Sequence, residues 1–140
     1  SRNFVSMKEF KSPDIVWSST TGRVLTMEYM DGVSIRNIEG IKKYGIDPKA
    51  LSEKVTEIFA QMIFQDGFVH CDPHPGNILV RPNPNKSWSL SSLFWWRPKP
   101  FQVVLLDHGL YRELEPVFRE NYLNLWDALI NFNEQKIELY

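Results

Sequence analysis

The spacing of apolar positions predicts one long amphipathic helix near the middle of the chain. Between Pro48 and Asp66, apolar residues recur every three or four positions, which places them on one helical face: Leu51, Val55, Ile58, Phe59, Met62 and Ile63. Asp47 is a suitable N-cap and Pro48 suits the first helical position. Gly67 is a natural stop, because glycine readily adopts the left-handed conformation that ends many helices. We therefore expect this helix to lead directly into the stretch that begins at Gly67.

The segment before this helix predicts a hairpin and a short helix. Two β-rich runs, Ile15–Ser18 and Arg23–Tyr29, are separated by a cluster of Ser, Thr and Gly. We expect them to form a hairpin that ends at Asp31-Gly32. The following residues, "VSIRNIEGIKKYG", predict a short helix capped by Ser34 and stopped near Gly45.

The second half of the chain predicts two strands and two helices. The runs "NILVR" and "FQVVLLD" read as strands, and a segment rich in Pro, Asn and Ser joins them. Glu115 and Pro116 open a further helix, and Asn133 can cap another. The first of these helices has an apolar face, made of Val117, Tyr122, Leu125, Trp126, Leu129 and Ile130.

Composition places the 140-residue chain among globular proteins. Apolar residues make up 43% and charged residues 24%. The formal net charge of −1 gives no overall attraction to nucleic acid, so we expect no nucleic-acid partner. A single cysteine excludes an internal disulfide partner. There is no apolar run of the roughly 18 residues that a membrane-spanning helix needs. The first residues lack an initiating Met and an apolar signal core, and we expect a piece of a longer chain.

Polar side chains suited to catalysis gather in "GFVHCDPHPGNILV", residues 67–80. Asn77 enters the predicted strand hairpin and Asp107 leaves it, so the two side chains should lie side by side. A carboxylate and a carboxamide together suit Mg²⁺, which takes few protein ligands and shares substrate phosphates. Asp72 lies five residues before Asn77 and could accept a proton from an attacking hydroxyl or water. This combination is typical of phosphoryl transfer.

These motifs also resemble a known family. "HCDPHPGN", residues 70–77, resembles the kinase catalytic loop H-R-D-x-x-x-x-N, and "DHG", residues 107–109, resembles D-F-G. The fuller strings "GFVHCDPHPGNILV" and "VVLLDHGLYREL" are similar to the UbiB family of AarF domain-containing atypical kinases. The resemblance implies an α+β, protein-kinase-like fold, mainly the helical C-lobe. Residues 1–32 would form the last hairpin and the hinge of the N-lobe, and residues 33–140 the C-lobe with a loop insert at 82–100.

The resemblance implies a role for each matching residue. Asp72 would be the catalytic aspartate, and His74 would occupy the position where many protein kinases have a lysine that touches the transferred phosphate. Asn77 and Asp107 would hold Mg²⁺. In "VLTMEYMDG", Met27 would lie behind the adenine of ATP, and the backbones of Glu28 and Met30 would face its edge. The implied function is an atypical kinase or ATPase that supports ubiquinone or related isoprenoid-lipid metabolism, in the mitochondrion.

The chain also departs from the kinase pattern. Cys71 replaces the arginine of H-R-D, and no A-P-E motif follows Asp107, so we expect no conventional activation segment. The chain has no Gly-rich loop, no phosphate-binding lysine with its glutamate partner, and no K-x-G-Q segment. We therefore expect it to be inactive unless the N-lobe is supplied.

Other interpretations remain open at this stage. A small-molecule phosphotransferase of the aminoglycoside or choline kinase type also has a histidine two residues after the aspartate. A non-catalytic, lipid-binding scaffold is another possibility. Asp72 and Asn77 could simply cap a turn. His70-x-Asp72-x-His74 has a spacing that could bind zinc, although we expect His70 to be a core histidine that shapes the loop.

Two further features have an ordinary and a functional interpretation. Cys71, next to Asp72, is expected to be small buried filler rather than a redox-sensitive thiol. Between Asp72 and Asp107 there are positive charges and aromatic residues but no acid: Arg81, Lys86, Arg97 and Lys99, with Trp88, Phe94, Trp95 and Trp96. We expect the aromatic residues to fold back on the lobe. Contact with membrane lipid or quinone intermediates is the next choice, and single-stranded nucleic acid fits less well.

Overall fold

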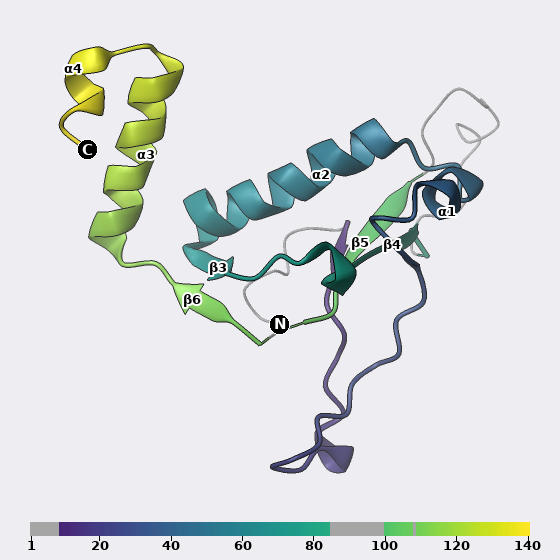
Figure 1. Cartoon of the computed structure of the whole chain (residues 1–140). Helices are drawn as coiled ribbons and strands as arrows, with labels where there is room; N and C mark the ends of the chain where they lie inside the picture. Colours follow the sequence, from purple (N-terminus) through teal and green to yellow (C-terminus); the bar gives the residue numbers. More distant parts are fainter. Residues whose placement is uncertain (1–8, 85–99, 108) are drawn as a thin grey trace.

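The computed structural model describes residues 9–84, 100–107 and 109–140 and has a mixed α+β fold (Figure 1). Its centre is a four-stranded sheet in the order β1-β5-β4-β2. The strands are β1 (Phe10–Lys11), β5 (Phe101–Leu105), β4 (Ile78–Pro82) and β2 (Val33–Ser34). β4 and β5 form the predicted antiparallel pair, with Ile78 opposite Leu105 and Arg81 opposite Gln102. β1 is parallel to β5, and β2 is antiparallel to β4.

The predicted long helix covers one face of this sheet (Figure 1). It comprises α2 (Pro48–Ala60) and a final π-helical stretch, η3 (Gln61–Asp66), where the sequence predicted a continuous α-helix. The Asp47 carboxylate caps it by accepting a hydrogen bond from Lys49 N (3.1 Å), and Gly67 ends it with φ +64°. Its buried side chains, among them Ile58 and Met62, pack against alternate residues of β4 and β5. These strand residues of the core are Ile78, Val80, Val103 and Leu105.

A separate two-stranded sheet joins the two sequence motifs. It pairs β3 (Phe68–His70) with β6 (Tyr111–Glu113) in antiparallel fashion. The loop of residues 71–77 follows β3, and the motif at residues 107–109 precedes β6. Hydrogen bonds continue beyond the strands, from Cys71 N to Leu110 O (2.9 Å) and from Leu114 N to Gly67 O (2.7 Å). This pairing therefore holds the two motifs together.

The N-terminal hairpin is only partly as predicted. The chain does reverse, with antiparallel bridges between Ile15 and Met27 and between Thr21 and Val24. Continuous strands do not form, and Trp17–Ser19 is a 3₁₀ turn, η2. Trp17 is 74% exposed and Val24 58%, so apolar burial does little to extend the pairing.

The predicted short helix begins later than expected. Ser34 belongs to β2 and does not cap a helix, because Val33 and Ser34 pair with Val80 and Leu79 of β4. The helix is α1 (Ile38–Lys43), and the Asn37 side chain caps it by accepting a hydrogen bond from Gly40 N (2.9 Å). The stop near Gly45 is confirmed by a φ of +71°.

The last two helices are confirmed. They are α3 (Pro116–Ile130) and α4 (Glu134–Ile137), and Asn133 caps α4 by accepting from Lys136 N (3.1 Å). α3 contacts α4 and η3, and Phe64 of η3 stacks on Tyr122 with ring centroids 5.8 Å apart. In the part of the chain described, no helix is long and apolar enough to span a membrane. Residues 85–99, which hold most of the predicted basic and aromatic insert, lie outside the described residues.

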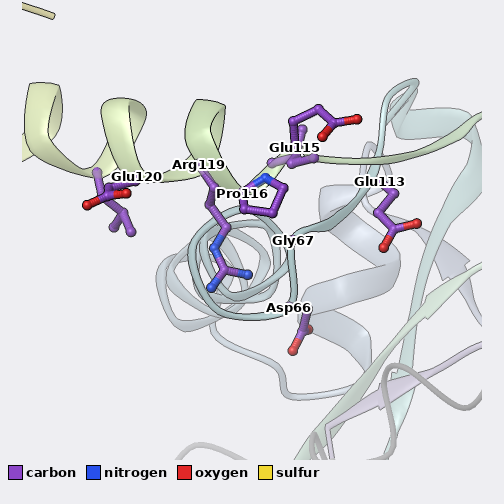
Figure 2. Close-up of a pocket in the computed structure, with 9 residues that line it drawn as sticks. Asp66, Gly67, Glu113, Glu115, Pro116, Arg119 and Glu120 are labelled. Carbon is purple, nitrogen blue, oxygen red and sulfur yellow. The ribbon is translucent and has the colours of Figure 1, made fainter.

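A groove of about 730 Å³ lies between the end of η3 and the start of α3 (Figure 2). Its polar lining is mostly acidic, from Asp66, Glu113, Glu115 and Glu120, with one cation from Arg119. Arg119 Nη1 donates to Gln65 O (3.2 Å), and a Cβ at Gly67 would lie 2.8 Å from the same nitrogen. The predicted site residues do not line this groove, so its size does not identify the site.

Candidate active site

His70 is the residue that joins the two motifs. It is only 2% exposed, at the end of β3, and its ring lies edge-on to Tyr111. Its Nδ1 accepts a hydrogen bond from Asp72 N (3.1 Å), so the proton of a neutral ring is on Nε2. Nε2 then donates to the backbone oxygen of Asp107 (2.7 Å). The expectation of a core histidine that shapes the loop is confirmed.

Asn77 and Asp107 lie side by side, as the hairpin argument predicted. Asn77 Nδ2 donates to Asp107 Oδ2 (3.1 Å), and Gly109 N donates to Asp107 Oδ1 (2.7 Å). The backbone at this end of the hairpin is also tied, because Leu106 N donates to Asn77 O (2.9 Å). The carboxylate and the carboxamide are therefore held by the ends of β5 and β4.

Asp72 and His74 occupy a compact, exposed loop between β3 and the 3₁₀ turn η4 (Pro75–Asn77). His74 N donates to Asp72 O (2.7 Å), and Asn77 N donates to His74 O (2.9 Å). The His74 Nδ1 accepts from Gly76 N (3.1 Å). In the neutral ring this leaves Nε2–H as a donor, which is suitable for a phosphate oxygen.

The donor set fits Mg²⁺ better than zinc. Asn77 and Asp107 supply oxygen atoms at one place, and a hard cation with few protein ligands requires little more. Rotation of the Asn77 amide would present its oxygen instead of its nitrogen. Both ring nitrogens of His70 form hydrogen bonds with backbone atoms, so neither nitrogen is available as a ligand for the suggested His-x-Asp-x-His zinc site. Across residues 9–84, 100–107 and 109–140, side chains of His, Cys, Asp and Glu form no group of three that could hold a metal.

The expected burial of Cys71 is wrong, because its side chain is exposed. Successive residues of a strand face opposite sides, and His70 takes the inward position at the end of β3. The next residue therefore faces outward. Its Sγ lies 3.6 Å from Val69 O.

The residues predicted to meet the adenine lie at the base of the N-terminal hairpin, where Met27 is bridged to Ile15, and directly after it. Met30 is 6% exposed and Met27 38%, while Tyr29 between them is 90% exposed. Glu28 Oε2 accepts from Lys11 Nζ (2.9 Å), and its pKa is lowered, chiefly because Lys11 donates this hydrogen bond. Burial lowers the pKa of Lys11, but hydrogen bonds to Asp14 and Glu28 outweigh burial and leave that pKa raised. The contact of Met27, Glu28 and Met30 with adenine stays a prediction.

Arg81 was missed as a structural residue, since the sequence suggested only that it added positive charge to the insert. Its Nη1 pairs with Asp31 Oδ1 (2.5 Å), and its Nε and Nη2 donate to Gln102 Oε1 (3.1 and 2.9 Å). One signal was available: in the run "NILVR", which the sequence predicts as a strand, alternation would place Arg81 on the same face as Asn77.

These features resemble those of one class of protein. A loop aspartate next to an Asn–Asp pair matches, in residue type and placement, the catalytic-loop Asp and Asn and the D-x-G aspartate of protein kinases. The model of the ABC1 atypical kinase-like domain matches residues 1–140, and the chain belongs to this family. The match supports a protein-kinase-like fold.

Individual relatives agree with this assignment. The chain is 41% identical over 135 residues to AarF domain-containing protein kinase 1 of Xenopus laevis, covering 96% of the chain and 24% of that protein. It is 37% identical over 134 residues to AarF domain-containing kinase 1 of Drosophila melanogaster, covering 96% and 23%. A protein of Arabidopsis thaliana named as an ABC1 protein is 45% identical over 125 residues, covering 89% and 22%. The chain thus spans less than a quarter of the length of these relatives.

Proposed function

We propose that the chain carries the Mg²⁺ ligands and the catalytic aspartate of an atypical kinase or ATPase that uses Mg-ATP. The observation that carries this proposal is the contact between Asn77 and Asp107, with His70 tying the Asp72 loop to the backbone of Asp107. Residues 1–32 would form the hairpin and hinge of an N-lobe, and residues 33–140 the C-lobe.

Each side chain has a defined task in this proposal. Asp72 accepts a proton from the attacking hydroxyl or water. Asn77 and Asp107 hold Mg²⁺, which when bound neutralises charge on the nucleotide phosphates. The His74 Nε2–H donates to a phosphate oxygen. The peptide nitrogen of Gly109 holds Asp107 Oδ1, and this leaves the other carboxylate oxygen, now paired with Asn77, for the metal.

ATP would bind with its adenine against the segment 27–30. Met27 would lie behind the base, and the backbones of Glu28 and Met30 would face its edge. The ion pair between Lys11 and Glu28 supports this proposal, because it gives the Glu28 carboxylate a partner other than the base.

The substrate class and the compartment rest on family resemblance alone. We propose that the protein supports ubiquinone or related isoprenoid-lipid metabolism in the mitochondrion. The support is the similarity of residues 67–80 and 103–114 to the UbiB family. If this is correct, cells that carry only the Asp72→Asn variant should lose quinone as completely as cells without the protein, measured by chromatography of lipid extracts. A normal quinone content would contradict the proposal.

The first experiment is a thermal shift with ATP, with and without Mg²⁺. It compares the 140-residue chain with a protein extended at its N-terminus by an N-lobe. Ligand that binds the native state raises the unfolding midpoint. We expect a Mg²⁺-dependent rise in the extended protein only. No rise in either protein would contradict nucleotide binding and favour the non-catalytic lipid-binding scaffold.

Two substitutions in the extended protein separate the proposed tasks. Asp107→Asn should abolish the Mg²⁺-dependent shift, because it removes a charged metal ligand. Asp72→Asn should keep the shift and lower ATP turnover by about 100-fold or more, the usual size of a general-base contribution. Glu53→Gln, which removes an exposed carboxylate on α2, is the control and should change neither. Equal turnover in wild type and Asp72→Asn would contradict the assignment of the base.

A further inference from the structure

Arg81 links the segment that precedes β2 to both central strands. Arg81 and Gln102 are direct cross-strand partners in β4 and β5. The guanidinium donates twice to the Gln102 side-chain oxygen, at 3.1 and 2.9 Å, and a third nitrogen pairs with Asp31. These three residues will be called the Arg81 clamp. The planar guanidinium of Arg81 thus joins two residues, Asp31 and Gln102, that lie on different parts of the chain.

The burial of the Arg81 clamp indicates a specific role. The Arg81 side chain is 14% exposed and Gln102 is 4% exposed, although both are polar. A guanidinium held out of water needs its hydrogen bonds satisfied, and the partners supply them in a fixed plane. Asp31, by contrast, is 74% exposed, so the clamp holds a surface residue onto a buried one.

The backbone beside Asp31 is pressed directly against β4. A Cβ at Gly32 would lie 3.0 Å from Val80 O, and Gly32 has a φ of +146°, a conformation that other residues rarely adopt. Val33 then pairs with Val80. The position of Asp31 is therefore set against the strand that carries Arg81.

The same short segment is held at its other end. Glu28 Oε2 accepts from Lys11 Nζ (2.9 Å) and from Asp14 N (3.2 Å). Between Glu28 and Asp31, Met30 is buried at 6% exposure. The segment from Glu28 to Asp31 is thus tied at one end to the N-terminal residues and at the other to the central sheet.

We propose that Arg81 is a positioning residue that sets the distance between the nucleoside-binding segment, Glu28–Asp31, and the Asn77–Asp107 metal pair. The inference rests on the proposed function. Asn77 ends η4 directly before β4, and Arg81 is the fourth residue of β4, a separation of at most about 13 Å at the rise of a β-strand. β4 therefore holds the two parts of the nucleotide site at a fixed separation. Arg81 itself need not touch the nucleotide.

The test compares two ligands by calorimetry in the protein extended by an N-lobe. Mg-ATP engages both parts of the site, whereas Mg-tripolyphosphate engages only the metal pair. We expect Arg81→Gln to weaken Mg-ATP binding about fivefold, a typical effect of a residue that touches neither ligand. The affinity for Mg-tripolyphosphate should stay at the wild-type value. A purely structural role for Arg81 would weaken both ligands or neither.

Two further variants keep the test decisive. Asp31→Asn alters an exposed side chain, so it should fold, and it should weaken Mg-ATP in the same selective way. The double variant should be no weaker than Arg81→Gln, because both changes break one interaction. Arg36→Gln removes an exposed charge five residues beyond Asp31 and should change neither affinity.

The outcomes separate the two proposals. Unchanged Mg-ATP affinity in Arg81→Gln and Asp31→Asn overturns the positioning role, as does an equal loss for both ligands. If the wild-type protein binds neither ligand, the proposed function fails, and the positioning role fails with it.

Discussion

The two longest helices have similar apolar patterns but different surroundings. α2 has 13 residues and packs on the central sheet, where Ile58 is 2% exposed. α3 has 15 residues, and only Ala128 among them is buried. Phe118 and Ile130 of α3 are 54% and 69% exposed. Helical periodicity therefore identified both helices, while burial depended on what lies opposite each one.

The candidate site is attached to the packed region. Asn77 precedes β4 and Asp107 follows β5, the two strands that lie under α2. β3 runs from the end of η3 to His70, and its partner β6 leads from the site to α3. The β3–β6 pair therefore connects the well-packed region around α2 with the exposed helix α3.

The largest expected effect is a difference in stability loss between two substitutions, one in α2 and one in α3. Ile58→Ala should lower the free energy of unfolding of the chain by about 2–5 kcal/mol, because it leaves a cavity in the core. Ile130→Ala, the matched control, removes the same atoms from an exposed position and should change it by about 0.5 kcal/mol or less. Denaturant titration measures both. Equal losses would mean that α3 is as firmly packed as α2.

The next effect tests the link itself. His70→Ala removes a buried ring that bonds to two backbone groups and should cost about 1–3 kcal/mol of unfolding free energy. The matched control is His74→Ala on the exposed loop, which should cost about 0.5 kcal/mol or less. Amide hydrogen exchange should show Asp72 N losing protection in the first variant only. Retained protection at Asp72 would show that the loop is held without His70.

The last effect, a pH dependence at Tyr111, appears only at high pH. Burial, with a smaller contribution from the charge of Asp107, raises the pKa of Tyr111 to about 12. An unfolded tyrosine ionises near pH 10, so the folded state keeps its proton to higher pH. The resulting stabilisation is complete below about pH 10 and is lost as the pH rises from 10 to 12. Tyr111→Phe should remove this part of the decline.

Asp107→Asn provides a second measurement of the same group. Without the carboxylate charge the Tyr111 pKa should fall, and ultraviolet absorbance of the phenolate would follow it. The ring stacks on Phe68 with centroids 4.9 Å apart, so it should remain buried and the pKa should stay above 10. An unchanged pKa would show that the Asp107 charge does not reach the phenol.

Much of the fold could be predicted because its signals are local. The cap at Asp47, the stop at Gly67 and the strands β4 and β5 all follow from residues next to them in sequence. The adjacency of Asn77 and Asp107 also follows, because an antiparallel pair brings its outer ends together whatever the length of the connection. The family resemblance rests on these same loops.

The errors arose where a partner distant in sequence decided the outcome. Ser34 could have capped a helix, but pairing with Leu79 places it in β2. Cys71 was expected to be buried, yet the alternation of β3 turns His70 inward and Cys71 outward. Neither result can be read from the neighbouring residues alone.

The sequence by itself determined the helices α2, α3 and α4, the strands β4 and β5, and the residue types that meet at the ends of those two strands. Only the tertiary structure decided which of these residues are buried, since burial needs a second surface. Arg81 is the clearest case, because its partners Asp31 and Gln102 lie 50 and 21 residues away. Local sequence specifies the conformation of a segment, whereas packing between distant segments specifies the environment of its side chains.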